Sequence, residues 1–353
     1  MNRKLILTFL LTFLLTFILV LSGCSSSEIL EDSDKPSIVC TAFPQYDWTL
    51  QILGDRAEEF NVTLLNHQGT DMHSFQPTAA NMVSMANCDL FIHIGGYSEG
   101  WVPAALESAG NDHAQVLTLL DHVEARAEEF TEGMEHNHDH DHGHEAAADH
   151  AGEADEADDA DSHEGHDHEE DAHAEELDEH LWLSLRCAQQ ACDVITDAIC
   201  QLDPAGTETY RANASAYKEQ LHNLDLAYEQ AVHDANTNVL LFADRFPFRY
   251  LTDDYGIEYL AAFPGCSAET EASFETIIYL SEEMEAHHLN CAVVLEGSKE
   301  DFAKTVLSNT SAENPKILTL NSMQSVNQRH IDAGVTYLSI MEDNLKVLKK
   351  ALN

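Results

Sequence analysis

A chain of 353 residues is long enough for about two domains, and a hydrophobic content of 44% is sufficient for two ordinary cores. Its 63 acidic residues against 17 basic ones give a formal net charge of -46 at pH 7. That charge excludes nucleic acid as a partner, because phosphates would be repelled, and it favours cations over anionic substrates.

Residues 1–24 have the pattern of a signal peptide. A short basic start precedes an apolar run at 5–21, and the tetrapeptide LSGC follows the run and ends at Cys24. Small residues before such a cysteine resemble the lipobox of bacterial lipoproteins, in which the cysteine is lipidated and becomes the mature N-terminus. The alternative is an uncleaved membrane anchor, because about 17 apolar residues are near the lower limit for a span. Both interpretations place the chain outside the cytoplasm, with residues 25–36 as a polar tether.

Strand and helix patterns alternate through residues 37–131. Apolar runs predict strands, and runs with apolar residues three and four apart predict helices between them. One helix should stop at Gly54, and the next should be capped by Thr78. Such alternation predicts a parallel sheet covered by helices on both faces. The predicted strands are 38–42, 60–65, 88–96 and 115–119, and the predicted helices are 46–54, 79–86 and 101–110.

The stretch 132–179 separates this unit from the next. It holds 21 acidic residues and ten histidines, and no lysine or arginine occurs between Arg126 and Arg186. It is too polar to bury a core, so we expect a disordered, solvated loop. Imidazole and carboxylate bind metals, but alternating His-Asp-His has no fixed geometry, which predicts several weak sites. The alternative is an acidic spacer with incidental histidines. The candidate low-affinity ligands are His136, His138, His140, His142, His144, His163, His166 and His168.

Two helices follow the acidic stretch. The first, within 180–203, should complete the first lobe, because its apolar residues recur at intervals of three and four until Asp203 and Pro204 end it. The second, within 204–236, would be about 40 Å long at about 1.5 Å per residue. That length is enough to pass from one domain to the next.

Strand and helix patterns alternate again in residues 237–353. This second alternation ends in a long amphipathic helix near the C-terminus. The predicted fold class is therefore α/β: two lobes, each with a mostly parallel sheet flanked by helices, joined by one long helix. The predicted strands of the second lobe are 239–243, 257–263, 291–296 and 316–320.

The eight cysteines do not form a recognisable metal motif. Without Cys24 seven remain, an odd number that cannot all pair, although one disulfide could form among them. No C-x-x-C pair occurs, so the sequence does not indicate a thiolate zinc site. Six of these seven cysteines lie in or beside predicted strands or along the 180–203 helix. These positions favour a role as small buried hydrophobic side chains for most of them.

Two histidines stand where an α/β sheet places its ligands. His73 lies in the loop GTDMHSFQPT between a predicted strand and a predicted helix, and His180 lies in DEHLWL, where the acidic stretch rejoins the fold. Both are expected at the C-terminal side of the first lobe's sheet, where open α/β sheets bind ligands. A single loop histidine is usually incidental, and two at the same edge indicate a site. We also expect Trp182 to pack beside His180 and exclude water.

The chain from about residue 36 resembles the metal-specific solute-binding lipoproteins of bacterial zinc and manganese ABC importers. The segment around His73 with its downstream Gln-Pro-Thr resembles that family's first metal-ligand loop, and the segment around His180 resembles the second. An acidic His-rich insert before the second ligand is typical of the zinc branch. The resemblance implies a monomeric, non-enzymatic receptor with a metal site between its lobes, which delivers metal to an ABC permease and its ATPase.

The sequence departs from the family pattern at two ligand positions. Ala243 stands where the family usually has a histidine, and Asn321 stands where many members have an aspartate. Asp244 is the nearest replacement, since carboxylate oxygen is an acceptable zinc ligand; alternatively, it pairs with Arg245 or caps the following turn. Glu296 is a weaker candidate that could equally be a structural acid, and the amide of Asn321 would bind zinc weakly.

Two imidazoles with oxygen ligands suit Zn²⁺ or Mn²⁺, and the His-rich stretch favours zinc. Because imidazole binds metal only when neutral, we expect binding to weaken as pH falls through about 6.5. The alternatives are a manganese receptor, or a surface metal buffer or adhesin without a role in transport.

One motif indicates a different class of protein. The sequence GYSEG at 96–100 matches the G-x-S-x-G nucleophile elbow of serine hydrolases, with Ser98 as the nucleophile. No oxyanion-loop signature of the HGGG type accompanies it. Glu99 and Trp101 also match a glycine-rich turn of the metal-binding family, so we retain the hydrolase only as a remote alternative.

Overall fold

The structure is a computed structural model, and it describes residues 35–134, 177–266 and 272–353. Cys24 and the lipobox therefore lie outside the described residues. So do the eight candidate low-affinity histidines between His136 and His168. Among the described residues, no helix is both long and apolar enough to cross a membrane.

The first lobe is built on a four-stranded parallel sheet, which confirms the predicted architecture. The strand order is β2-β1-β3-β4, and β1 and β3 at its centre are buried along their whole length. Each strand is shorter than its predicted apolar run. The strands are β1 (Ser37–Cys40), β2 (Asn61–Leu64), β3 (Leu90–His93) and β4 (Gln115–Thr118).

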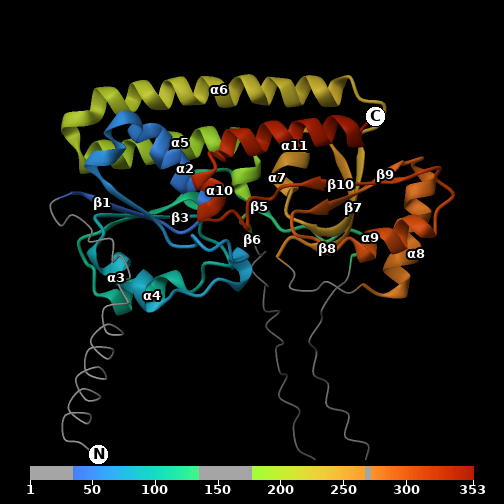
Figure 1. Cartoon of the computed structure of the whole chain (residues 1–353), viewed down its shortest axis with the longest axis horizontal. Coiled ribbons are helices and arrows are strands. Elements are labelled where there is room, and N and C mark those ends of the chain that lie inside the picture. The colour runs from blue at the N-terminus through green and yellow to red at the C-terminus, as the bar shows by residue number, and fades with distance from the viewer. Residues whose placement is uncertain (1–34, 135–176, 267–271) are drawn as a thin grey trace, which may run out of the picture.

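Helices cover both faces of this sheet (Figure 1). The helix predicted to stop at Gly54 does end there, at a φ of 56°, and a 3-10 helix (Gly54–Glu59) follows. Thr78 caps the next helix as expected, since its hydroxyl accepts a hydrogen bond from the backbone N–H of Asn81 at 3.2 Å. The helices are α2 (Phe43–Leu53), α3 (Ala79–Asn87) and α4 (Val102–Ala109).

The second lobe repeats the parallel arrangement with strand order β10-β9-β7-β8. Strand β7 runs further than predicted, to Phe246, and its register with β8 shifts between Phe242 and Arg245. The strands are β7 (Val239–Phe246), β8 (Glu258–Pro264), β9 (Cys291–Leu295) and β10 (Lys316–Leu320). The helices are α7 (Arg249–Tyr255), α8 (Phe274–Ala286), α9 (Asp301–Ser308), α10 (Gln328–Asp332) and α11 (Tyr337–Ala351).

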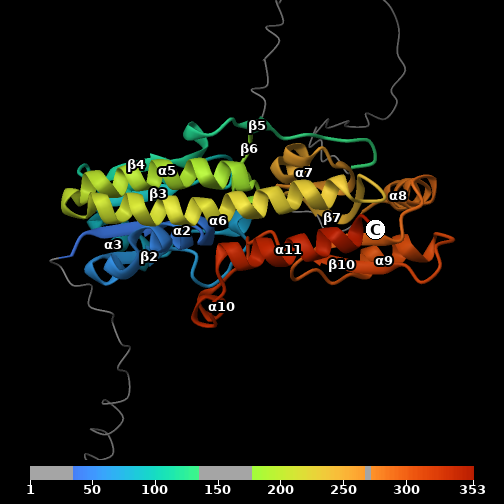
Figure 2. The ribbon, with the colours of Figure 1, turned by 90° about the horizontal axis from the view of Figure 1, so that it is seen from above.

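One long helix joins the lobes, as predicted. Helix α5 (Leu185–Leu202) lies on the first lobe, and α6 (Thr207–His233) runs above both lobes beside α5 and α11 (Figures 1 and 2). The apolar faces of these helices and the adjoining sheet faces form one continuous core that spans both lobes. The helical pattern that begins near Leu181 is a 3-10 turn (Leu181–Leu183) before α5, whose N-terminus is capped by Ser184.

The ends of the acidic stretch are part of the fold. A two-stranded antiparallel sheet pairs β5 (Arg126–Ala127) with β6 (Leu177–Asp178), where the chain leaves and returns. Met134 is 5% exposed, and the carbonyl oxygen of Gly133 accepts a hydrogen bond from Thr276 of α8 at 3.0 Å. The folded frame thus extends further into residues 132–179 than composition alone predicts.

Candidate metal centre

His73 is held by a turn of its own loop. It lies in a 3-10 turn (Met72–Ser74) after β2, and its side chain is 8% exposed. One oxygen of Asp71 accepts hydrogen bonds from the His73 backbone N–H at 3.1 Å and from Nδ1 at 2.9 Å. A carboxylate at Nδ1 assigns the proton to that nitrogen and leaves the Nε2 lone pair available to a metal.

His180 is held in the same way after β6. One oxygen of Asp178 accepts from the His180 backbone N–H at 2.8 Å and from Nδ1 at 2.9 Å. The side chain is completely buried, yet its Nε2 has no hydrogen-bond partner. A buried polar atom without a partner costs free energy, so this nitrogen is suited to a ligand that the chain itself does not supply.

The structure brings the two predicted histidines together. Their ring centroids are 5.4 Å apart, and the Nε2 of His73 also lacks a hydrogen-bond partner. That nitrogen lies 3.3 Å from Oε1 of Glu179, and the two form an ion pair when the imidazole is protonated. Trp182 is buried with its ring centroid 5.1 Å from that of His180, which confirms the expected packing.

Glu179 adds a buried carboxylate to the pair. It accepts hydrogen bonds from the backbone N–H of Ser98 at 2.9 Å and from the Ser98 hydroxyl. Gly96 makes room for it: at φ 85°, a Cβ added there would lie 2.8 Å from Cβ of Glu179. Burial disfavours the charged form, but His73, His180 and the two Ser98 hydrogen bonds outweigh burial and lower the pKa of Glu179. The carboxylate is therefore ionised near neutral pH.

Cys266 completes the cluster from the second lobe. Ligand atoms of His73, Glu179, His180 and Cys266 all lie within 4.8 Å of one another. Sequence reasoning missed Glu179 and Cys266 as members of this cluster. Glu179 adjoins a predicted ligand, and that adjacency could have indicated it. Cys266 lies two residues after the end of β8, at the carboxyl edge of the second sheet, but no C-x-x-C spacing marks it.

The charges around His73 favour its protonated form when metal is absent. Burial lowers the pKa of His73, but the hydrogen bond to Asp71 and the neighbouring Glu179 outweigh burial and raise the pKa to about 9. Asp71 also forms an ion pair with Arg245 of β7 at 2.6 Å, which reaches across from the second lobe. A dication can replace the proton at this anionic position.

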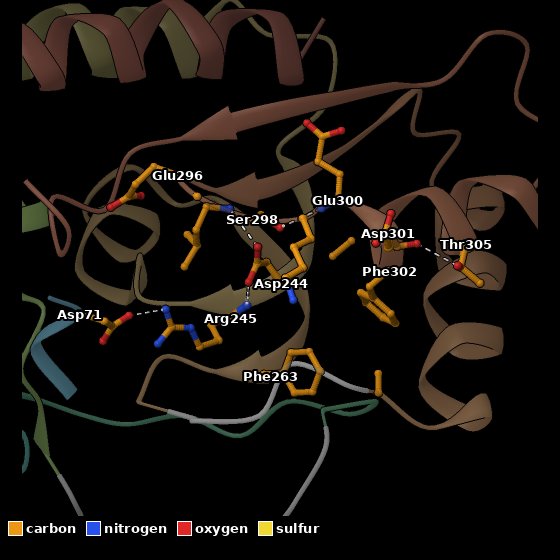
Figure 3. A pocket seen from close by; sticks show the side chains of 15 residues that line it. Asp71, Asp244, Arg245, Phe263, Glu296, Ser298, Glu300, Asp301, Phe302 and Thr305 are labelled. Atoms are coloured by element: carbon orange, nitrogen blue, oxygen red, sulfur yellow. Dashed lines mark hydrogen bonds and ion pairs between the residues drawn. The ribbon is translucent and has the colours of Figure 1, made fainter. Parts of the chain in front are cut away.

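The structure does not bring the other three candidate ligands into this cluster. The carboxylate of Asp244 accepts from the backbone N–H of Arg245 at 2.8 Å and of Leu295 at 3.1 Å, and it lines a separate pocket of about 680 Å³ (Figure 3). Glu296 accepts from the N–H and hydroxyl of Ser322 at 2.7 and 2.9 Å.

The third candidate, Asn321, is similarly engaged, because its side-chain oxygen accepts from the N–H of Met323 at 2.8 Å. All three side chains thus satisfy backbone donors of their own lobe. The register shift in β7 contributes to this outcome: it places Ala243 inside the strand, where it is 3% exposed, and Asp244 beside β9. Their role as ligands stays a prediction from sequence.

Ser98 does not have the geometry of a hydrolase nucleophile. Its hydroxyl donates to the Glu179 carboxylate rather than to an imidazole base. Nucleophilic serine needs a base within hydrogen-bond reach that can take its proton, and a carboxylate of lowered pKa is poorly suited to that. The GYSEG turn instead supports the metal cluster.

The cysteines give no disulfide in the described part of the chain. Cys40, Cys88, Cys187, Cys192 and Cys291 are buried, as expected for small hydrophobic side chains. Burial raises the pKa of the Cys40 thiol to about 12, although a hydrogen bond to Thr49 lowers it. The thiol therefore stays protonated. Cys200 and Cys266 are half-buried.

The comparisons with known proteins agree with the geometry. The zinc-binding lipoprotein AdcA of Streptococcus pneumoniae is 30% identical over 332 residues, which cover 94% of this chain and 58% of that protein. This chain therefore spans somewhat more than half of that relative. The high-affinity zinc uptake system protein ZnuA of Bacillus subtilis is 28% identical over 338 residues, covering 95% of this chain and 94% of that protein.

A solved structure gives the same result for the fold. The Zn(II)-bound ZnuA-like domain of Streptococcus pneumoniae AdcA matches with a TM-score of 0.65 and 25% identity, over 90% of this chain and 99% of that domain. The model of the ZnuA family, described as "Zinc-uptake complex component A periplasmic", matches residues 38–351. This family consists of binding components rather than enzymes. The chain belongs to the ZnuA family of zinc-uptake components.

Proposed function

We propose that this protein is an extracytoplasmic zinc receptor that binds Zn²⁺ between its lobes and delivers it to an ABC permease powered by an ATPase. One observation carries the proposal. Two histidines lie side by side in a buried cluster, and each is fixed through Nδ1 by its own aspartate. Nε2 of His180 has no hydrogen-bond partner among the described residues, and Nε2 of His73 faces the carboxylate of Glu179. This is the arrangement of zinc-binding histidines, whose second nitrogen usually donates to a carboxylate.

The site is built to bind rather than to react. Catalytic zinc sites keep an open coordination position for water or substrate, whereas closed sites with four protein ligands are typical of structural zinc. Here the available nitrogens, carboxylate and sulfur converge within 4.8 Å in a half-buried to buried setting. With four protein donors around the ion, no coordination position is left for a substrate to react. Zinc is therefore the transported ion and not a catalytic cofactor.

The route of zinc to the site follows from charge. The net charge of -46 raises the local concentration of cations at the surface. We infer that the His-rich stretch with His136 to His168 collects zinc weakly and that the buried cluster holds it tightly. A lipid on Cys24 would keep the monomeric receptor next to its permease, as the lipoprotein names of relatives suggest.

A genetic experiment tests the transport role. A strain that lacks this gene should grow poorly in zinc-limited medium, and both added zinc and the intact gene should restore growth. A gene that carries His180→Ala should not restore it. Restoration by manganese instead of zinc would favour the manganese receptor. Full restoration by the His180→Ala gene would favour a surface metal buffer that acts through the His-rich stretch.

A further inference from the structure

We propose that Cys266 binds the zinc ion as a thiolate, and that this sulfur is the second lobe's ligand. This inference rests on the proposed zinc-receptor function and specifies the site on which it depends. The resemblance to metal-specific binding proteins implies a histidine at the position of Ala243, and this chain has none there. A thiolate just beyond the end of the neighbouring strand β8 would fill the same role.

The backbone around Cys266 is fixed against the first lobe by two contacts. Its N–H donates to Oε1 of Glu128 at 3.2 Å. The preceding Gly265 lies so close to His180 that a Cβ added there would be 3.1 Å from the imidazole Cε1 and 2.9 Å from the carbonyl oxygen of Phe246. The end of β8 therefore passes directly over the buried imidazole, which leaves the thiol in reach of its Nε2.

The thiol itself points into the cluster. Its sulfur lies 4.0 Å from Oε1 of Glu179, at the outer limit for a thiol donor, and within 4.8 Å of the ligand atoms of both histidines. An independent observation indicates a missing ligand at the same place: Nε2 of His180 is completely buried without a partner. A zinc ion bound by these atoms would satisfy that nitrogen.

The charges of the four groups balance a dication. Two neutral imidazoles, one carboxylate and one thiolate sum to the charge of Zn²⁺ with opposite sign, so the ion and its four ligands together are neutral. Neutrality matters because burying an uncompensated charge is costly. Binding requires the Cys266 thiol to release its proton to solvent as the sulfur–zinc bond forms, and no oxidant or reductant is involved.

A sulfur ligand also determines which metal is held. Thiolate prefers softer ions such as Zn²⁺, whereas Mn²⁺ prefers carboxylate, carbonyl and water oxygens. The Cys266 sulfur therefore favours zinc over manganese, and the selectivity of the site depends on this one side chain. In the matched variant Cys266→Ser, the ratio of zinc to manganese affinity should fall at least about tenfold.

X-ray absorption of the full chain loaded with less than one equivalent of zinc tests the proposal. A sulfur shell at about 2.3 Å, beside nitrogen and oxygen ligands at about 2.0–2.2 Å, is expected. Residues 132–179 contain no cysteine, so zinc in the His-rich stretch cannot produce this shell. Cys266→Ser should lose the shell, and the half-buried Cys200→Ser should keep it.

The outcomes separate the two proposals. A tight zinc equivalent that depends on His180 but lacks a sulfur shell would overturn the role of Cys266 and leave the receptor function intact. A sulfur shell that persists in Cys266→Ser would also overturn it. If no tight zinc binds at all, the receptor function and the thiolate ligand both fail. Cobalt(II) substitution gives a second readout, because a sulfur-to-cobalt charge-transfer band should appear in the original chain and vanish only in Cys266→Ser.

Discussion

The two lobes have closely similar sheets but contribute to the metal centre unequally. The first lobe supplies His73, Glu179 and His180, each held by hydrogen bonds within that lobe. The second lobe brings only Cys266 to the cluster. In the site that we propose, one lobe therefore carries a preorganised half, and the other completes it with a single donor.

The acids of the second lobe illustrate the difference. Asp244 lies within β7 and Glu296 directly follows β9, and their carboxylates accept hydrogen bonds from the backbone N–H groups of Leu295 and Ser322. A carboxylate that already accepts such bonds would have to give them up to reach a metal. The acids of the second lobe are thus engaged in its packing, whereas Nε2 of His180 in the first lobe has no hydrogen-bond partner among the described residues.

The lobes are fastened to each other behind the cluster. Trp182 donates through Nε1 to the carbonyl oxygen of Ser322 at 2.8 Å, and Tyr337 donates its hydroxyl to the Trp182 carbonyl at 2.6 Å. Tyr250 donates to the carbonyl oxygen of Asp178 at 2.8 Å. These buried bonds lie next to the ligand segment and beneath the long helix, so we expect relative lobe motion to be small.

Removing an imidazole from the preorganised half should have the largest effect. His180→Ala or His73→Ala should weaken zinc affinity by more than about 100-fold, since even the outer partners of zinc-binding histidines contribute about 10- to 100-fold. Competition titration with a chromophoric chelator measures the change. The exposed His113→Ala serves as control and should leave the affinity of the tight site unchanged. A loss below tenfold in both ligand variants would contradict the assignment.

Removing the aspartates that orient the imidazoles should have the next largest effect. Asp178→Asn and Asp71→Asn should each lower zinc affinity by about 10- to 100-fold, because the amide is a weaker partner for Nδ1–H. The same competition titration measures this loss of zinc affinity. Asp197→Asn is a suitable control, because Asp197 is 58% exposed and pairs with Arg211 at the surface. Unchanged affinity in both aspartate variants would show that the two turns do not set the ligand geometry.

Zinc affinity should also depend on pH over a higher range than free imidazole predicts. With the pKa of His73 raised to about 9, protons compete with zinc below pH 9, so affinity should fall by up to tenfold per pH unit as pH decreases. Calorimetry in buffers of different ionisation enthalpy measures the protons released. A profile that changes only below about pH 6.5 would indicate that His73 has an ordinary pKa.

The same raised pKa has the opposite consequence for the metal-free protein. Because the folded-state pKa of His73 lies above the unfolded value, its stabilising contribution is complete below about pH 6.5 and is lost as pH rises through about 9. Thermal unfolding of the metal-free chain between pH 6 and 10 measures this. In Asp71→Asn the pH dependence should shrink, since Asp71 is the main partner that raises the pKa.

Changing an acid that packs in the second lobe should have the smallest effect. Asp244→Asn should alter zinc affinity by no more than about two- to threefold, the range of substitutions away from a site. An amide oxygen can still accept the N–H of Leu295, so the fold should persist. A loss above tenfold would place Asp244 in the site, as its sequence position predicts, and would contradict the contrast between the lobes.

Much of this arrangement could be predicted from sequence. The βα alternation, the stop at Gly54 and the cap at Thr78 are local signals, and all three are confirmed. His73 and His180 could also be predicted. His73 follows a predicted strand, and His180 lies beside an apolar run where the acidic stretch rejoins the fold. Each also stands two residues after an aspartate, and the repeated Asp-x-His spacing is the local signal for the turns that hold them.

The second lobe's ligand could not be predicted in the same way. Which residue reaches the cluster depends on how far β7 and β8 extend, on the register shift after Phe242, and on the close approach of Gly265 to His180. These are tertiary features with no local pattern. The family pattern therefore led to Ala243 and Asp244, whereas the structure brings Cys266, two residues after the adjacent strand β8, into reach.

The central claim is that tight zinc binding belongs to the interlobe cluster. Its most direct test is zinc stoichiometry by competition titration on a soluble form that begins at Lys35 and lacks residues 136–175. This deletion keeps buried Met134 and strand β6, which belong to the folded frame. We predict one tight zinc equivalent, lost in His180→Ala. If the tight equivalent disappears with the deletion alone, the interlobe cluster is not the receptor site and the account is wrong.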